Sequence, residues 1–307
     1  MITLKTSVNI APNQFQCCAK FDATHVLAAG FNTPIVGGDP SVYMYSWNGT
    51  IFTPLGSTDL SGGETTGSNL KVQGNFIYRD GSGWSTASGA GVGQVEWDGS
   101  AFINGVMLIY YPGMIGMDPN EYRGRVYGYD GDGTYMFVCG RTWLVVSFPP
   151  YVLRYKYTID ALQSSSGGSS LKKSLEVNLA DCGNVICAFG QIYLCGSPTV
   201  KRFTYVPAPA GFTLTGTYAN PGITCFHTSL VGDWLLGVSS GSTLSAYTQT
   251  MTLLSSINTG TVITGVSSSG GYIFVSHPTT TEVYTYDGVN YTLVDSAALG
   301  IEKAFII

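Results

Sequence analysis

The sequence has little charge and no clean helical periodicity. Asp, Glu, Lys and Arg together make up 11% of the 307 residues, against about 25% in an ordinary soluble domain. No stretch longer than about a dozen residues repeats its apolar positions with the period of an amphipathic helix. We therefore expect almost no helix. The surface is either rich in Ser, Thr and Gly or, as we favour, largely covered by neighbouring subunits of an assembly.

Targeting and metal-binding signals are also missing. Residues 1–6 lack the charged start and apolar run of a signal peptide, and no apolar run reaches the roughly 18 residues of a membrane span. The chain has seven cysteines, but no Cys-x-x-Cys pair of the kind that binds zinc. We expect these cysteines to be free, buried and apolar in role, which suits assembly in a reducing cytoplasm.

Candidate catalytic groups are few and do not converge. The three histidines, His25, His227 and His277, fall in three different repeats of the sequence. The segment 237–241 has the G-x-S-x-G spacing of a nucleophile elbow, but a predicted strand follows where an elbow needs a helix. The segment 130–133, Asp-Gly-Asp-Gly, is half of a calcium loop without its final acid, so we expect a turn, with a weak cation site as the alternative. We predict no catalytic residue, no metal and no cofactor.

What the sequence does contain is a recurring pattern: an aromatic residue, Asn or Asp, Gly, two residues and another aromatic. Asn-Gly and Asp-Gly favour two-residue hairpin turns, because both central residues need a positive φ. Such a turn makes Tyr45 face Phe52 and Tyr284 face Tyr291, each pair contributing about 0.2–1 kcal/mol. A lone hairpin is only marginally stable in water, so we expect the copies to stack on one another. They are YMYSWNGTIF (43–52), VEWDGSAF (95–102) and YTYDGVNY (284–291).

An aromatic anchor before such a hairpin recurs every 39 to 60 residues along the chain. Two short apolar strands precede each anchor and a fourth strand follows it, which is typical of propeller blades. We interpret the Ser/Gly stretch 163–170 as merely flexible. The sequence thus predicts an all-β fold: one domain over 1–307, a six-bladed β-propeller of four-stranded antiparallel blades, with a β-sandwich as the alternative. The anchors are Trp47, Trp97, Tyr157, Tyr205, Tyr247 and Tyr286.

The two ends of the chain have no place in the six repeats. Residues 1–14 form a predicted N-terminal arm, and residues 301–307, IEKAFII, form a further apolar strand. An apolar strand edge rarely stays exposed, because it invites aggregation. We expect the ends to pair and close the ring, or the C-terminal strand to dock on a neighbouring subunit.

Two predicted loops, 81–94 and 111–124, are longer than the others. Long loops on a rigid scaffold often carry recognition, and aromatic and Met residues are enriched at protein interfaces. The alternative is that these residues cap the propeller's own core. The candidate partner contacts are Trp84, Tyr111, Met114, Met117 and Tyr122.

The charge-poor texture, rich in Gly, Ser, Thr and Tyr, is similar to that of propellers carried by bacteriophage tail nozzle and hub proteins. The resemblance extends over the whole chain but includes no motif, so it transfers no functional residue. It implies a non-enzymatic structural protein of a phage tail or attachment device, located in the virion after assembly in the host cytoplasm. Its partners would be other virion proteins and copies of itself.

Two other function classes remain open. The first alternative is a carbohydrate-binding or adhesion propeller, whose ligand would be a host surface glycan. A hydrolase or lyase ranks behind it, because the sequence shows no converging carboxylates or histidines. With a net charge of −5 and no basic stripe, the chain is not expected to bind nucleic acid.

Overall fold

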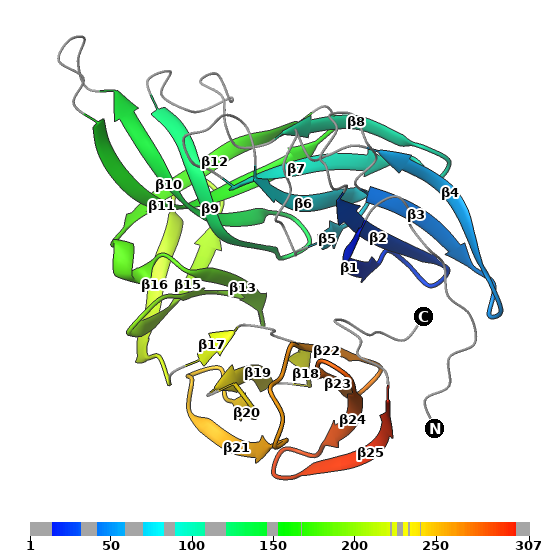
Figure 1. Ribbon diagram of the computed structural model, residues 1–307. Helices are drawn as coiled ribbons and strands as arrows, with labels where there is room; N and C mark the ends of the chain where they lie inside the picture. Colours follow the sequence, from blue (N-terminus) through cyan, green and yellow to red (C-terminus); the bar gives the residue numbers. More distant parts are fainter. Residues whose placement is uncertain are drawn as a thin grey trace.

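The computed structural model describes residues 14–31, 42–58, 70–82, 90–107, 121–145, 153–166, 168–221, 223–225, 230–232, 234–239 and 241–298. Within these ranges the chain is all-β, apart from one short 3-10 turn, η1 (Leu179–Asp181). Six antiparallel sheets stand around a common centre and form a six-bladed β-propeller, as predicted (Figure 1). These ranges contain no helix long and apolar enough to cross a membrane.

Each blade consists of four consecutive strands, and the first strand lies nearest the centre of the ring (Figure 1). Blade 5 has an additional short strand that pairs with β19. Blades 1 to 3 contain β1 (Gln14–Lys20), β2 (His25–Phe31), β3 (Val42–Trp47), β4 (Phe52–Thr58); β5 (Leu70–Gln73), β6 (Phe76–Ser82), β7 (Ala90–Trp97), β8 (Phe102–Met107); β9 (Glu121–Gly131), β10 (Met136–Val145), β11 (Leu153–Ser165) and β12 (Gly168–Val177). Blades 4 to 6 contain β13 (Asn184–Ala188), β14 (Gln191–Cys195), β15 (Thr199–Val206), β16 (Gly211–Ala219); β17 (Ile223–Cys225), β18 (Leu230–Val231), β19 (Trp234–Ser239), β20 (Thr243–Tyr247), β21 (Leu253–Asn258); β22 (Gly265–Ser269), β23 (Tyr272–Ser276), β24 (Thr281–Tyr286) and β25 (Tyr291–Ala297).

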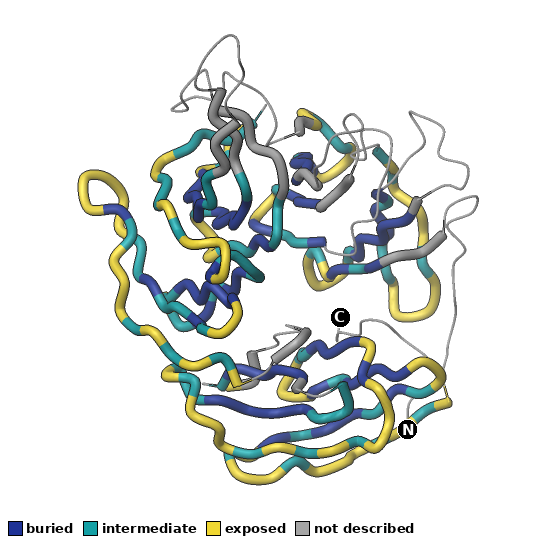
Figure 2. Tube along the Cα trace, turned by 60° about the vertical axis from the view of Figure 1, so that its left-hand side comes forward, coloured by how far each residue is buried: buried dark blue, intermediate teal, exposed yellow. Residues whose placement is uncertain are grey.

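The core lies between blades. Where a blade is covered by a neighbour on both sides, its middle strands are buried on both faces and read as continuous apolar runs. In β14, for example, Ile192, Tyr193 and Leu194 are all buried. Ile192 packs in one cluster with Phe137 and Ile159 of blade 3. The outer strands instead alternate between exposed and half-buried residues (Figure 2).

The predicted hairpin register is wrong by two residues. Trp47 pairs with Phe52, and the partner of Tyr45 is Pro54. The physical reason is the Asn48 side chain, whose Oδ1 accepts backbone N–H groups at 3.0 Å and closes a four-residue loop. A shift of two keeps the same face of the strand, so the Trp47 and Phe52 rings still meet, with centroids 4.5 Å apart.

One anchor is also misplaced. Four anchors end the third strand of their blade and Tyr205 stands one residue before that end, but Tyr157 lies inside β11. The hairpin of blade 3 comes later, where Ser165 pairs with Gly168. The stretch 163–170 is therefore the outer hairpin of this blade rather than a flexible insertion. The two predicted terminal segments, 1–14 and 301–307, lie outside the described residues except for Gln14, which begins β1, so their pairing stays a prediction.

Candidate interaction surface

Blade 3 extends beyond the rest of the ring. Its strands β9, β10 and β11 have 11, 10 and 13 residues, whereas the first three strands of blade 4 have 5, 5 and 8. The additional length lies at the start of β9, the end of β10 and the start of β11, and projects from the ring at the upper left of Figure 1. We call residues 121–125, 141–145 and 153–157 the blade-3 extension.

Strand register brings three aromatic residues of the extension into one row. Trp143 in the middle strand pairs with Tyr122 of β9 on one side and with Tyr155 of β11 on the other. Two positions closer to the ring in the same strand is Arg141, which pairs with Arg125. Trp, Tyr and Arg are the residues that most often carry binding energy at protein interfaces, so the composition of these rows is typical of a contact surface.

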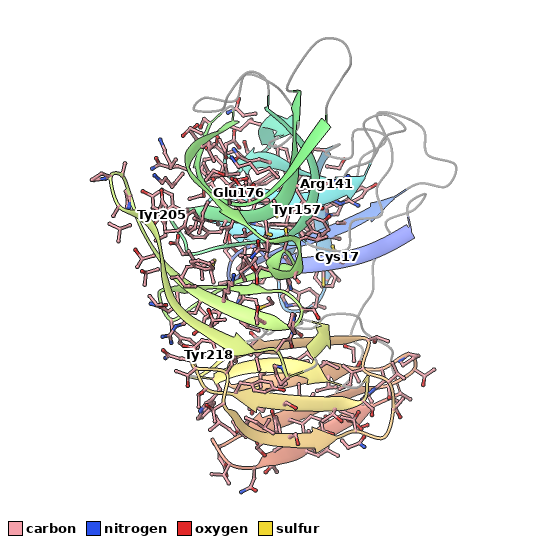
Figure 3. The ribbon with its side chains drawn as sticks, turned by 90° about the vertical axis from the view of Figure 1, so that its left-hand side faces the viewer. Cys17, Arg141, Tyr157, Glu176, Tyr205 and Tyr218 are labelled. Atoms are coloured by element: carbon pink, nitrogen blue, oxygen red, sulfur yellow. The ribbon has the colours of Figure 1, made fainter. Side chains whose placement is uncertain are left out.

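The extension also concentrates positive charge. It holds five of the 14 Lys and Arg residues but only one of the 19 acidic residues, in a chain whose net charge is −5. At its base the Arg141 and Tyr157 side chains are half-buried and occupy paired positions on neighbouring strands (Figure 3). This concentration of basic residues in the sequence of the extension favours a partner with acidic groups. The basic residues are Arg123, Arg125, Arg141, Arg154 and Lys156.

Of the five predicted contact residues, the described part of the chain includes one, and their role in contacts stays a prediction. Trp84, Tyr111, Met114 and Met117 lie outside the described residues. Tyr122 is described, but it belongs to strand β9 and not to a loop. The predicted loops are shorter than expected, because β6 continues to Ser82, β7 begins at Ala90 and β9 begins at Glu121. Sequence reasoning missed the partners of Tyr122, since they lie in two other strands that are separate from it in the sequence.

A second surface consists of aliphatic side chains on outer strands. We define the apolar rim as the exposed aliphatic residues of β4, β21 and β25, in blades 1, 5 and 6. Leu253 and Leu293, for example, are 55% and 52% exposed. Outer strands have one unpaired edge, and exposed apolar residues along such an edge favour association with another chain. The rim comprises Leu55, Leu253, Leu254, Leu293 and Val294.

A shallow groove of about 300 Å³ lies between blades 3 and 4. Its lining is mostly apolar, with Glu176 and Lys201 as the charged residues. The Lys201 Nζ lies 2.6 Å from Asp181 Oδ2, and Thr199 donates to the other carboxylate oxygen at 3.0 Å. Burial alone would raise the pKa of Asp181, but these bonds outweigh it and hold the pKa below its ordinary value. Lys201 is thus held in a structural ion pair.

The described histidines have structural partners. His277 is buried, with Nδ1 3.0 Å from the Val262 carbonyl oxygen and Nε2 3.3 Å from Glu282 Oε2. The Tyr284 hydroxyl donates to the same Glu282 oxygen at 2.7 Å; burial and this carboxylate raise the pKa of Tyr284. His25 contacts Asp22 within a hairpin turn at 2.7 Å. His227 lies outside the described residues.

The half calcium loop forms a turn, as expected. Asp132 Oδ1 accepts the backbone N–H groups of Thr134 and Tyr135. Asp130 instead contacts two other blades, through Lys71 Nζ at 2.9 Å and the Cys187 N–H at 2.9 Å. Within the described residues no three His, Cys, Asp or Glu side chains gather as a metal site would require. A strand, β20, follows the segment 237–241, so it is not a nucleophile elbow.

No family model matches the chain, and no curated protein matches it in sequence. Among solved structures, the chain is similar to BamB from Moraxella catarrhalis, with a TM-score of 0.51 and 12% identity over 96% of this chain and 80% of that one. A proposed 6-phosphogluconolactonase from Bacteroides fragilis has a TM-score of 0.47 at 10% identity, over 92% and 97% of the two chains. A protein from Lactobacillus plantarum has 0.47 at 12%, over 92% and 98%. At these identities the likeness concerns the fold alone.

Proposed function

We propose that the chain is a non-enzymatic structural propeller that works through protein–protein contacts, as a tail or attachment component of a virus particle. The apolar rim is the observation that carries the proposal. A chain with only 11% charged residues that also exposes Leu253 and Leu293 on outer strands has a surface suited to being covered. The texture shared with phage tail propellers supports the virus assignment.

The two surfaces have different roles in this proposal. The rim offers aliphatic side chains and open strand edges, which suit a copy of the same chain or a similar virion protein. The blade-3 extension offers Tyr, Trp and Arg, which suit a more specific contact. A host glycan is the alternative ligand for the extension, because the register row of Tyr122, Trp143 and Tyr155 consists of the aromatic residue types that stack on sugar rings.

Self-association of the full chain tests the rim. Light scattering over a concentration series should show oligomers for the wild type and a shift toward monomer for the double variant Leu253→Ser, Leu293→Ser. Val206→Ser is the matched control, because Val206 is 53% exposed but lies on β15, outside the rim. A wild type that stays monomeric at every concentration would remove the support for the rim as a contact between copies.

The virus assignment and the alternative have separate tests. Flanking genes should encode virion proteins; a neighbourhood of unrelated metabolic genes contradicts the assignment. A glycan array should show no specific binding. Specific binding that is lost in Trp143→Ala would favour the carbohydrate-binding alternative.

A further inference from the structure

Two cysteines from neighbouring blades meet in the structure. Cys139 lies in β10 of blade 3, and Cys182 follows η1 on the segment that leads into blade 4. Their sulfur atoms are 2.6 Å apart, which leaves no room for a third atom between them. The Cys182 thiol also lies 3.8 Å from the Gly140 carbonyl oxygen, so its side chain is directed at β10. The structure has no disulfide bond between them.

We propose that Cys139 and Cys182 are a reversible oxidation site, at which a disulfide oxidant such as oxidised glutathione converts the two thiols into a bond between blades 3 and 4. The inference does not depend on the proposed function. It concerns a pair of side chains that are already in contact, so bond formation needs no rearrangement of the blades. Neither the rim nor the extension takes part in it.

The exposure of the two thiols determines the order of steps. Cys182 is half-buried, whereas Cys139 is completely buried. Cys182 is therefore the sulfur that oxidised glutathione can reach: as a thiolate it attacks one sulfur of the oxidant, and one glutathione leaves as thiolate. Cys139 then loses its proton and attacks the Cys182 sulfur of the mixed disulfide, releasing the second glutathione. The two protein thiols have lost two protons and two electrons, and oxidised glutathione has become two reduced molecules.

The environment of Cys139 determines the rate of the second step, its attack on the mixed disulfide. Burial raises the pKa of Cys139 well above its ordinary value, and the nearby Asp160 carboxylate, which is still present in the mixed disulfide, raises it further. Because the thiolate is the attacking species, the second step should accelerate as the pH rises above neutrality. The mixed disulfide at Cys182 should therefore accumulate briefly before the bond between the blades closes.

Cys195 differs from this pair. It is also buried, but its thiol donates to the Tyr193 carbonyl oxygen. The two members of the proposed pair are 43 positions apart in the chain. A cross-link across such a segment restricts the unfolded chain and so stabilises the folded one. Oxidation should therefore raise the thermal unfolding midpoint.

The experiment compares the full-length protein after treatment with oxidised glutathione and after treatment with dithiothreitol. The expected results are the loss of two hydrogen atoms in the intact mass, a cross-linked Cys139–Cys182 peptide in a non-reducing digest, and a higher Tm. Cys182→Ser should abolish all three, while Cys195→Ala should leave them unchanged. Circular dichroism shows whether each variant is folded.

Three outcomes would overturn the proposal. The first is an unchanged mass after oxidation, which would mean that the thiols do not react. The second is a lasting glutathione adduct on Cys182 without a cross-link, which would mean that Cys139 cannot attack. The third is a cross-link that persists in Cys182→Ser, which would assign the bond to other cysteines.

Discussion

At the scale of single residues, five hairpin turns in the described part of the chain are closed by the same contact. In each turn one side-chain oxygen of Asp or Asn accepts the backbone N–H groups two and three positions later, at 2.7 to 3.0 Å. Because both the neutral Asn and the charged Asp side chain accept these hydrogen bonds, the turn needs a short side chain with an acceptor oxygen and does not need a charge. The residues are Asp22, Asn48, Asp98, Asp132 and Asp287.

Replacing Asn48 by alanine tests this interpretation. The Asn48→Ala variant leaves two backbone N–H groups of the turn without their side-chain acceptor. We expect a loss of about 0.5–1.5 kcal/mol in the free energy of unfolding, measured by urea denaturation. Asn48→Asp keeps the acceptor and should be close to the wild type. A loss in Asn48→Asp as large as in Asn48→Ala would show that the acceptor is not what the turn requires.

The pH dependence of stability reports the same contact at Asp98. Hydrogen bonds from the N–H groups of Ala101 and Ser100 lower the pKa of this exposed carboxyl in the folded chain. A carboxyl with a lowered folded pKa stabilises the protein above its unfolded pKa, near 3.9, and this contribution is lost as the pH falls through the folded pKa. Urea midpoints should therefore fall more steeply below about pH 4 in the wild type than in Asp98→Asn. Parallel curves would contradict the assignment.

At the scale of elements, the positions of strands and turns were predictable from the sequence, but the pairing register of the hairpins was not. Short apolar segments between Gly, Asn and Asp identify strands and turns, because these residues favour turn conformations. The same Asn-Gly dipeptide, however, can form a two-residue or a four-residue loop. The choice here depends on the Asn48 side chain, which bonds inside the loop. Turn propensity takes no account of that hydrogen bond. The hairpins of the recurring pattern were therefore predicted two residues out of register.

The blade-3 extension was predictable only in part. Tyr122 belonged to the candidate contact set, but its partners Trp143 and Tyr155 did not. Each of these residues belongs to a different strand, and only the pairing of the three strands assembles the row. The basic residues were equally dispersed along the chain, so the sequence showed no basic stripe. Contacts between distant segments are the information that a local pattern lacks.

The charge of the extension can be measured on a sulfated polysaccharide column. We expect the protein to be retained at low salt despite its net charge of −5, because the local field of the extension exceeds the effect of the distant acids at short range. Arg125→Ser with Arg154→Ser should elute at a lower salt concentration. The matched control is Lys172→Ser with Lys173→Ser, a basic pair on β12 outside the extension. Equal shifts for both variants would show that retention reflects total charge alone.

At the scale of the whole molecule, the ring is held together by contacts between neighbouring blades. The largest apolar clusters combine residues of adjacent blades, such as Phe137 with Leu194. Polar contacts add to them at the inner strands, where Asp130 of blade 3 reaches Lys71 of blade 2 and the Cys187 N–H of blade 4. The stability of one blade therefore depends on how closely the next blade can approach.

Gly128, in the inner strand β9, tests this dependence. A Cβ at this position would lie 2.6 Å from the Asn184 Cα and 2.8 Å from the Val185 nitrogen, both backbone atoms of β13. Gly128→Ala should therefore push blades 3 and 4 apart and cost about 1–3 kcal/mol in the free energy of unfolding. In the outer strand, Gly56→Ala is the control, because its Cβ would first meet the Trp97 side chain at an ordinary 3.6 Å. Urea denaturation of both variants decides the matter: if Gly128→Ala unfolds at the same midpoint as Gly56→Ala, close approach of the inner strands does not limit the stability of the ring.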